Sequence, residues 1–124
     1  MTTRAFNTQS RRKEDLVPRR GGELGMYVCG VTVYDVSHIG HGRSAIVFDV
    51  IRRYLRHRGH AVKFVKNFTD IDDKIIRRAS QEGVAARDVS ERYIAEYRTD
   101  MASLGVLPPD VEPKATEHIP QMIT

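Results

Sequence analysis

The chain has 124 residues, of which 40% are hydrophobic and 29% are charged, and its formal net charge is +4. This length suits one ordinary domain and is too short for two. No apolar run approaches the roughly 20 residues of a membrane-spanning helix, and no apolar segment follows Arg11-Arg12, so we expect neither a membrane protein nor a secretory signal. The only cysteine, Cys29, cannot form an internal disulfide, which fits a reducing, cytoplasmic location.

Basic residues concentrate in two places, and a basic chain can accept a polyanionic partner. The first group lies near the start and the second lies on one later segment. A solvated helix face explains the second group equally well. The groups are Arg11, Arg12, Lys13, Arg19 and Arg20, and then Arg52, Arg53, Arg56 and Arg58.

The first half of the chain predicts a strand, a helix and a second strand. After a short strand at residues 6–8, the composition of residues 9–25 predicts a loop. The apolar run 26–29 between Gly25 and Gly30 predicts a buried strand. Ser37 is the candidate N-cap of a helix that Gly59 ends, and residues 61–66 predict the next strand. The residues expected on the buried helix face are Ile39, Ile46 or Val47, Val50, Ile51, Tyr54 and Leu55.

This order indicates an α/β fold with a Rossmann-like parallel sheet built around a βαβ crossover. In open parallel sheets, ligands bind beyond the carboxyl ends of the strands. Both predicted strand ends, at Cys29-Gly30 and at residues 67–70, should therefore face one crevice.

Three further helices are expected. Thr69 and Asp72 have the spacing of a capping box for a helix that ends near Gly83, with Asp72 and Asp73 in its first turn. A long helix spans 86–104, with Tyr93 and Tyr97 in the core. A last helix begins near Thr116 and stops after about two turns, with apolar residues unpartnered. We therefore expect the chain to be the front portion of a longer protein.

The tetrapeptide His38-Ile39-Gly40-His41 lies where the crossover helix begins. A helix N-terminus attracts anions, and two imidazoles one turn apart add hydrogen-bond donors that can follow phosphate oxygens. Gly40 lets a nucleotide approach the backbone. Two surface histidines near a cap are the alternative, but the position after a strand favours the phosphate-binding interpretation. Zinc binding by the two histidines is a weaker interpretation, because no third ligand lies nearby in the sequence.

Cys29 has three interpretations. Free cysteines are often inert core thiols. At the carboxyl end of a strand, however, a thiolate would face the crevice, as a nucleophile or as one ligand of a metal whose other ligands come from elsewhere. The acidic stretch 70–73 lacks the glycine and distal glutamate of a calcium-binding hand, so we reject a calcium site there. Thr69 and Asp70 remain candidates for the crevice.

Three segments in order, "GMYVCGVTVYDVSHIGHGRS", "FDVIRRYLRHRGH" and "VKNFTDIDDKIIRRA", closely resemble the first part of bacterial cysteine–tRNA ligases. The likeness runs from "FNT" at Phe6 to "PKATEHI", essentially the whole chain. His38-Ile39-Gly40-His41 resembles the first signature of class I aminoacyl-tRNA synthetases. The resemblance implies that residues 1–124 are the N-terminal portion of a nucleotide-binding catalytic domain that activates L-cysteine with ATP and Mg²⁺ and passes it to tRNA(Cys).

The resemblance also implies roles for individual residues. Cys29 matches the first of four ligands of a Zn²⁺ that binds the substrate thiolate, and a soft cation selects a thiol over a hydroxyl. His38 and His41 match the residues that stabilise the ATP phosphates during attack on the α-phosphorus. The remaining matches are Gly30 and Thr69 near the bound cysteine, and Thr32 and Gly40 on the nucleotide side.

The departures from the family concern Val31, where many members have proline, and the absence of the other zinc ligands and of the lysine-rich second signature. We therefore expect the 124-residue chain alone neither to retain zinc nor to charge tRNA. The nearest alternative is the ligase that joins cysteine to an amino sugar in mycothiol synthesis, which usually departs from Thr32-Val33-Tyr34 and from Asp73-Lys74. A short non-catalytic nucleotide-binding module and a basic α/β domain with a core cysteine are the others.

Overall fold

The computed structural model describes residues 3–18 and 22–123. Arg19 and Arg20 of the first basic group lie outside the described residues. The elements follow in the order β1 (Arg4–Asn7), β2 (Arg12–Asp15), β3 (Glu23–Val28), α1 (Ile39–His57), β4 (Ala61–Lys66), α2 (Asp73–Glu82), α3 (Ala86–Ser103), a 3₁₀ turn η1 (Ala115–His118) and α4 (Ile119–Ile123). No helix among the described residues is both long and apolar enough to cross a membrane.

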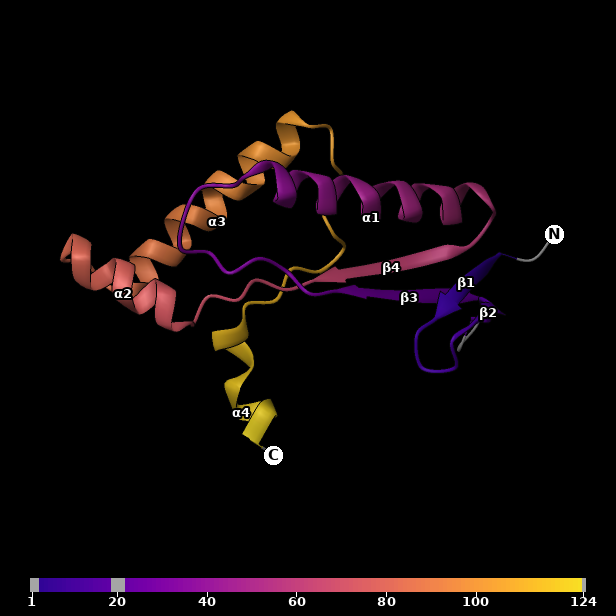
Figure 1. The fold of residues 1–124 in the computed structure, drawn as a ribbon, viewed down its shortest axis with the longest axis horizontal. Helices are drawn as coiled ribbons and strands as arrows, with labels where there is room; N and C mark the ends of the chain where they lie inside the picture. Colours follow the sequence, from indigo (N-terminus) through magenta and orange to yellow (C-terminus); the bar gives the residue numbers. More distant parts are fainter. Residues whose placement is uncertain (1–2, 19–21, 124) are drawn as a thin grey trace.

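The centre of the fold is the parallel pair β3–β4, joined through α1, as Figure 1 shows. The register runs from Glu23 opposite Ala61 to Val28 opposite Lys66. This confirms the α/β prediction with a βαβ crossover, and β4 has the predicted bounds.

A segment that was not predicted covers the other edge of β4. Val111 bridges Val65 in parallel, and Lys114 bridges Phe68. The Lys66 amide donates to the Val111 carbonyl at 3.1 Å. The segment carries prolines at its start and centre, which is why the sequence did not suggest a strand there. Residues 110–115 thus give β4 a partner on both sides.

The prediction of a loop over residues 9–25 was wrong, because β2 and the start of β3 fall within it. β1 and β2 form an antiparallel hairpin in which Arg4 lies opposite Asp15 and Asn7 lies opposite Arg12. Arg4 forms an ion pair with Asp15 at 3.2 Å, and Asn7 donates to Glu14 at 2.9 Å. Polar pairs hold this hairpin together, so its strands lack the apolar alternation that marks a half-buried strand.

The helix α1 differs from its prediction in two respects. Its N-cap is His38 and not Ser37. Of the predicted buried face only Leu55 is buried, whereas Ile39, Ile46, Val47, Val50, Ile51 and Tyr54 are 41–90% exposed. The residues that α1 buries instead are Gly42, Ala45, Asp49, Arg52 and Leu55.

Arg52 explains why a charged face of α1 can be buried. Its guanidinium, with 1% of the residue exposed, donates to the carbonyls of Pro108 at 2.8 Å and Leu107 at 3.0 Å. It also donates to Asp49 at 2.8 Å and lies 5.1 Å from the centre of the Phe64 ring. These contacts compensate for the loss of hydration that makes buried charges rare.

The helices α2 and α3 pack beside the carboxyl ends of the strands (Figure 1). Asp72, and not Thr69, caps α2 by accepting from the Lys74 amide at 2.9 Å, and Gly83 ends the helix with a left-handed φ of 68°. The long helix ends at Ser103, one residue before its predicted end. Tyr93 and Tyr97 are buried as predicted. The last predicted helix is a 3₁₀ turn followed by the short α4, and neither buries a residue.

Candidate functional site

The segments that follow β3 and β4 stay side by side beyond the sheet. Thr32 bridges Thr69 in parallel. The Val33 amide donates to the Thr69 carbonyl at 3.3 Å, and the Thr69 amide donates to the Val31 carbonyl at 3.0 Å. The two strand ends therefore face one region, as the topology predicted. Three of the predicted site residues, Gly30, Thr32 and Thr69, lie along this seam.

Gly30 allows the two segments to approach closely. A Cβ atom on Gly30 would lie 1.4 Å from the Asn67 carbonyl oxygen, so no other residue fits without moving the backbone. The Gly30 amide donates to Asn67 Oδ1 at 2.8 Å. Asn67 was predicted only as the end of a strand. Its role in fixing the position of Gly30 depends on a contact across 37 residues, and no local sequence pattern reports such a contact.

Cys29 lies immediately after β3 and is exposed, so the core-thiol interpretation is wrong. Its sulfur lies 3.8 Å from the Gly30 carbonyl oxygen. Over residues 3–18 and 22–123, no group of three or more His, Cys, Asp and Glu side chains is placed to hold a metal ion. Zinc in proteins usually takes four ligands. Among the described residues, Cys29 is therefore one accessible thiol that could bind zinc. Cysteine sulfur is a common zinc ligand in proteins.

His38 and His41 form a reciprocal cap at the start of α1. His38 Nδ1 accepts from the Gly40 amide at 3.1 Å, and His41 Nδ1 accepts from the His38 amide at 3.3 Å. The two rings stack with 3.9 Å between their centres. Two imidazoles thus take the places that Ser or Thr and Glu fill in a common capping box.

The capping bonds determine what the rings present outward. An imidazole whose Nδ1 accepts a hydrogen bond carries its proton on Nε2, a tautomer assigned here from the bonding pattern. Burial lowers the pKa of His41, and the charges of His38 and Lys66 lower it further. His41 is therefore neutral at pH 7, with an Nε2–H donor. Together with the positive end of the helix dipole, this donor makes the start of α1 suited to an anion.

Gly40 is required by the position of the His38 ring. A Cβ atom on Gly40 would lie 2.8 Å from Cε1 of His38 and 3.0 Å from its Nδ1. A side chain there would displace the ring from its capping position. Gly40 therefore serves the imidazole pair directly, in addition to leaving the backbone open.

Asp70 has a different role from the one its position suggested. It is buried, and its carboxylate accepts from the Thr116 amide at 3.0 Å and from the Thr116 hydroxyl. This pair ties η1 to the end of β4. Asp70 is therefore engaged structurally, whereas its neighbour Thr69 faces the seam through backbone bonds. Asp73 lies in the first turn of α2, as predicted.

The two groups of predicted residues lie at the same end of the molecule. In Figure 1 the chain leaves the carboxyl end of β3 and turns back to begin α1 above that end of the sheet. Lys66, the last residue of β4, lies close enough to His41 to lower its pKa. The structure thus places the start of α1 at the same end of the sheet as the exposed thiol of Cys29.

Comparisons with known proteins agree with this arrangement. The family model described as the catalytic domain of class I (C) tRNA synthetases matches residues 15–124. The chain is 60% identical to the cysteine–tRNA ligase of Geotalea uraniireducens over 124 residues, and 57% identical to that of Trichlorobacter lovleyi over 124 residues. These alignments cover 100% of this chain but 25% and 26% of the two relatives. The chain therefore spans about a quarter of the length of these relatives.

A solved structure shares the fold. Mycobacterium tuberculosis methionyl-tRNA synthetase, in complex with methionyl-adenylate, superposes with a TM-score of 0.59 at 23% sequence identity. The match covers 66% of this chain and 16% of that chain, and it supports the fold alone. The seam between the strand ends, the histidine pair at the start of α1 and the family match over residues 15–124 lead to one conclusion: the chain belongs to the class I synthetase catalytic domains of the cysteine–tRNA ligase family.

Proposed function

We propose that residues 1–124 form the first portion of a cysteine–tRNA ligase and supply the part of its active site that binds ATP and positions L-cysteine. The observation that carries the proposal is the stacked His38–His41 cap at the start of α1. The cap occupies both Nδ1 atoms and leaves the Nε2 atoms as donors at the end of the molecule where the strand ends lie. The match over residues 15–124 supports the same assignment.

The proposed reaction has two steps. The carboxylate of L-cysteine attacks the α-phosphorus of ATP, which gives cysteinyl-adenylate and releases pyrophosphate. A ribose hydroxyl at the end of tRNA(Cys) then attacks the activated carbonyl, and AMP leaves. Negative charge shifts onto phosphate oxygens in the first step, so fixed donors that meet those oxygens lower its barrier.

His38 and His41 are the proposed catalytic pair of the first step. Their Nδ1 atoms are occupied by capping bonds, so the rings cannot rotate away without breaking the cap. A fixed donor stabilises developing charge better than one that must reorient. Gly40 keeps the His38 ring in place, and Thr32 lies beside the nucleotide. Magnesium would accompany the ATP phosphates.

Cys29, Gly30 and Thr69 are the proposed residues around the substrate cysteine. Zinc, when bound, supplies a soft Lewis acid that holds a thiolate and rejects the hydroxyl of serine. Cys29 would be one of its ligands. The described residues contain no group of three or more side chains that could hold a metal ion, so we expect the isolated chain to bind zinc weakly.

A chimera tests the proposal. Residues 1–124 replace the aligned quarter of the Geotalea uraniireducens ligase, and cysteine-dependent exchange of pyrophosphate into ATP is measured together with charging of tRNA(Cys). We expect both activities. Exchange without charging of tRNA, accompanied by transfer of cysteine to an amino sugar, would support the mycothiol-type ligase instead. Loss of both in a folded, zinc-loaded chimera would refute the proposal.

Two variants of the chimera separate the roles. His41→Ala should slow adenylate formation by about 10²–10³-fold, the usual cost of one transition-state donor, with little change in cysteine binding. His57→Ala, at the far end of the same helix, is the matched control. Cys29→Ser should lose zinc, measured by elemental mass spectrometry, and with it the preference for cysteine over serine. A Cys29→Ser variant that keeps both metal and activity would contradict this role.

A further inference from the structure

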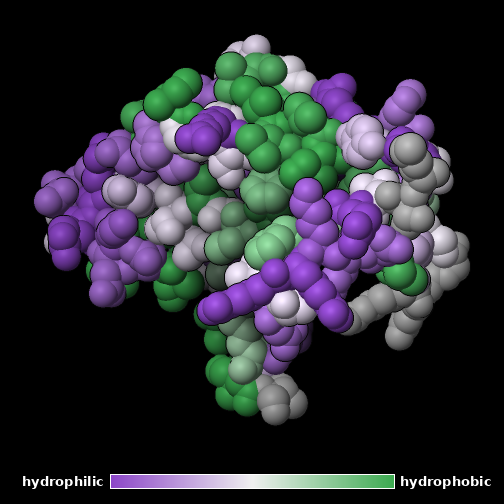
Figure 2. Space-filling view, turned by 45° about the vertical axis from the view of Figure 1, so that its right-hand side comes forward, coloured by the Kyte–Doolittle hydropathy of each residue, from purple (hydrophilic) through white to green (hydrophobic). Residues whose placement is uncertain are grey.

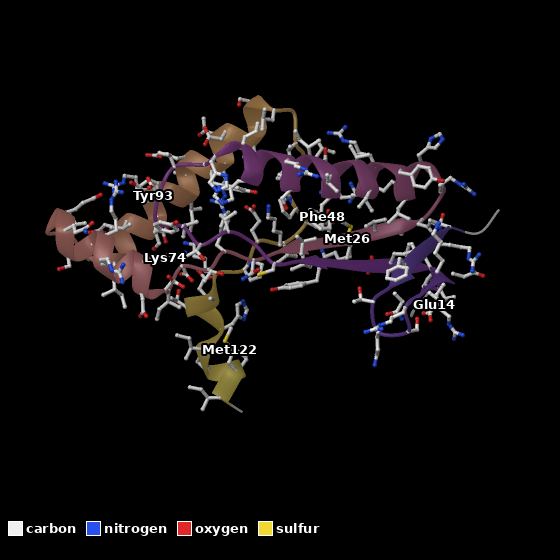
Figure 3. The ribbon with its side chains drawn as sticks, in the orientation of Figure 1. Glu14, Met26, Phe48, Lys74, Tyr93 and Met122 are labelled. Atoms are coloured by element: carbon white, nitrogen blue, oxygen red, sulfur yellow. The ribbon has the colours of Figure 1, made fainter. Side chains whose placement is uncertain are left out.

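A cavity lies beneath α1 and reaches Lys66, whose charge also acts on His41 of the proposed site. Its volume is about 230 Å³, and it is lined by residues of α1, β4, α3 and the segment that follows α3. None of the residues assigned to ATP, zinc or cysteine lines it. Figure 3 places Phe48 of α1 on the side of the helix that faces β4.

The walls of this cavity are mainly apolar. The apolar lining includes Phe48, Phe64, Met101, Leu107 and Pro108. Apolar walls around a few fixed polar groups are the usual composition of a small-molecule site. The cavity also offers more room than ordinary packing defects, since folded interiors leave few voids larger than a water molecule.

The polar side chains that line the cavity are Lys66, Tyr97, Arg98 and Glu112, and Lys66 is the buried cation among them. The residue is 8% exposed, and its ammonium donates to the hydroxyl of Tyr97. Burial lowers the pKa of Lys66, while Glu112 raises it. Burial and Glu112 raise the pKa of Tyr97 to about 12, so the phenol stays neutral. An ammonium has three donors, and a neutral phenol oxygen satisfies one of them.

The nearby acid does not neutralise this lysine fully. Glu112 lines the same cavity but is bonded to Arg98, with 3.0 Å between Nε and Oε2. Lys66 therefore retains donor capacity inside an apolar enclosure. An unsatisfied buried ammonium is costly, and an anion that reached it would relieve that cost.

We propose that this cavity binds a small apolar monocarboxylate, with the carboxylate on Lys66 and the hydrocarbon against Phe48, Phe64 and Met101. At about 30 Å³ per non-hydrogen atom, the volume holds roughly eight such atoms. Phosphates and other dianions fit poorly, because the walls are largely apolar and the second lining cation, Arg98, is already paired with Glu112. Ligands of this size bind at roughly millimolar concentration.

The test uses the intact 124-residue chain with labelled methionine methyl groups, observed by NMR. Hexanoate has the required size, and hexanamide is its neutral counterpart of equal length. Hexanoate should shift the Met101 signal in a saturable way and leave those of Met26 and Met122 unchanged. Hexanamide should bind at least tenfold more weakly.

Two matched variants assign the effect to the lysine. Lys66→Met should weaken hexanoate binding at least tenfold and remove the preference for hexanoate over hexanamide. The spectrum without ligand should remain that of a folded protein, because the substitution removes a buried charge. Lys63→Met, on the exposed side of β4, should bind hexanoate as the parent does. An unshifted Met101 signal in folded protein, equal shifts at all methionines, or a Lys66→Met variant with unchanged preference would each overturn the proposal. None of these readouts depends on ligase activity.

Discussion

The buried and exposed faces of α1 carry the reverse of the usual distribution of residues. The face against the sheet contains Gly42, Ala45 and the Asp49–Arg52 ion pair. The opposite face contains Val47, Val50 and Tyr54, and apolar residues gather at the height of α1 in Figure 2. Small residues and hydrogen bonds to residues 107–108 hold the inner face. The comparison shows that α1 is fixed by specific polar contacts more than by hydrophobic burial.

The largest expected loss of stability comes from removing the buried charge of Arg52 on the inner face of α1. Arg52→Met leaves Asp49 without its buried partner, and the Leu107 and Pro108 carbonyls lose their donors. We expect the free energy of unfolding to fall by about 3–5 kcal/mol, measured by urea denaturation. Arg53→Met is the control, because Arg53 also bonds Asp49 but is half exposed. Similar losses for the two variants would show that burial of Arg52 is unimportant.

A smaller loss of stability should follow from a larger side chain on the inner face of α1. A Cβ atom on Gly42 would lie 3.1 Å from Leu104 Cδ1, so Gly42→Leu forces α1 away from the end of α3. Overpacking of this kind costs about 1–3 kcal/mol. Ser44→Leu, on the exposed side, should cost far less in the same urea experiment. A neutral Gly42→Leu would mean that α1 and α3 can separate freely.

A still smaller effect should appear with pH at the start of α1. The pKa of His41 is lowered in the folded chain, so the unfolded chain binds more protons as the pH falls through 6.5. The contribution of His41 to the free energy of unfolding is complete above its pKa in the unfolded chain. It is lost as the pH falls toward its lower pKa in the folded chain. The melting temperature should therefore decrease between pH 7.5 and 5.5. The melting temperature of His41→Gln should decrease less over the same pH range. An identical decrease in the variant and the parent would exclude His41 as the cause.

The smallest effect is expected on the outer face. Val50→Lys replaces a side chain that already lies in water, so the free energy of unfolding should change by no more than about 0.5 kcal/mol. The variant should also self-associate less, because an exposed apolar patch is reduced. A loss above 1 kcal/mol at low protein concentration would show that this face packs against the chain after all.

Local patterns were sufficient to predict much of the fold. The apolar runs before Gly30 and Asn67 marked the parallel strands, and Gly83 marked the end of α2 because its backbone is left-handed there. The position of His38-Ile39-Gly40-His41 after a strand marked the start of α1, where the anion site is proposed. In each case the signal lies within a few residues of the feature.

The errors concern contacts between residues far apart in the sequence. Arg52 could be buried only because carbonyls more than fifty positions later accept its hydrogen bonds, and no helical period reports that. The N-cap was assigned to Ser37 because hydroxyls cap more often than imidazoles. The cavity at Lys66 required the relative placement of α1, α3 and residues 105–112, which no single segment contains.

The bond between Arg52 and the Pro108 carbonyl also sets a temporal order for biosynthesis. Donor and acceptor are 56 positions apart, so a ribosome adding about 5–20 residues per second makes the acceptor roughly 3–11 s after the donor. Until then the guanidinium stays hydrated, and the inner face of α1 lacks the carbonyls that complete its packing. The helix α1, which carries the histidine pair, is therefore synthesised early, but its packing is completed only after residues 107–108 have been made.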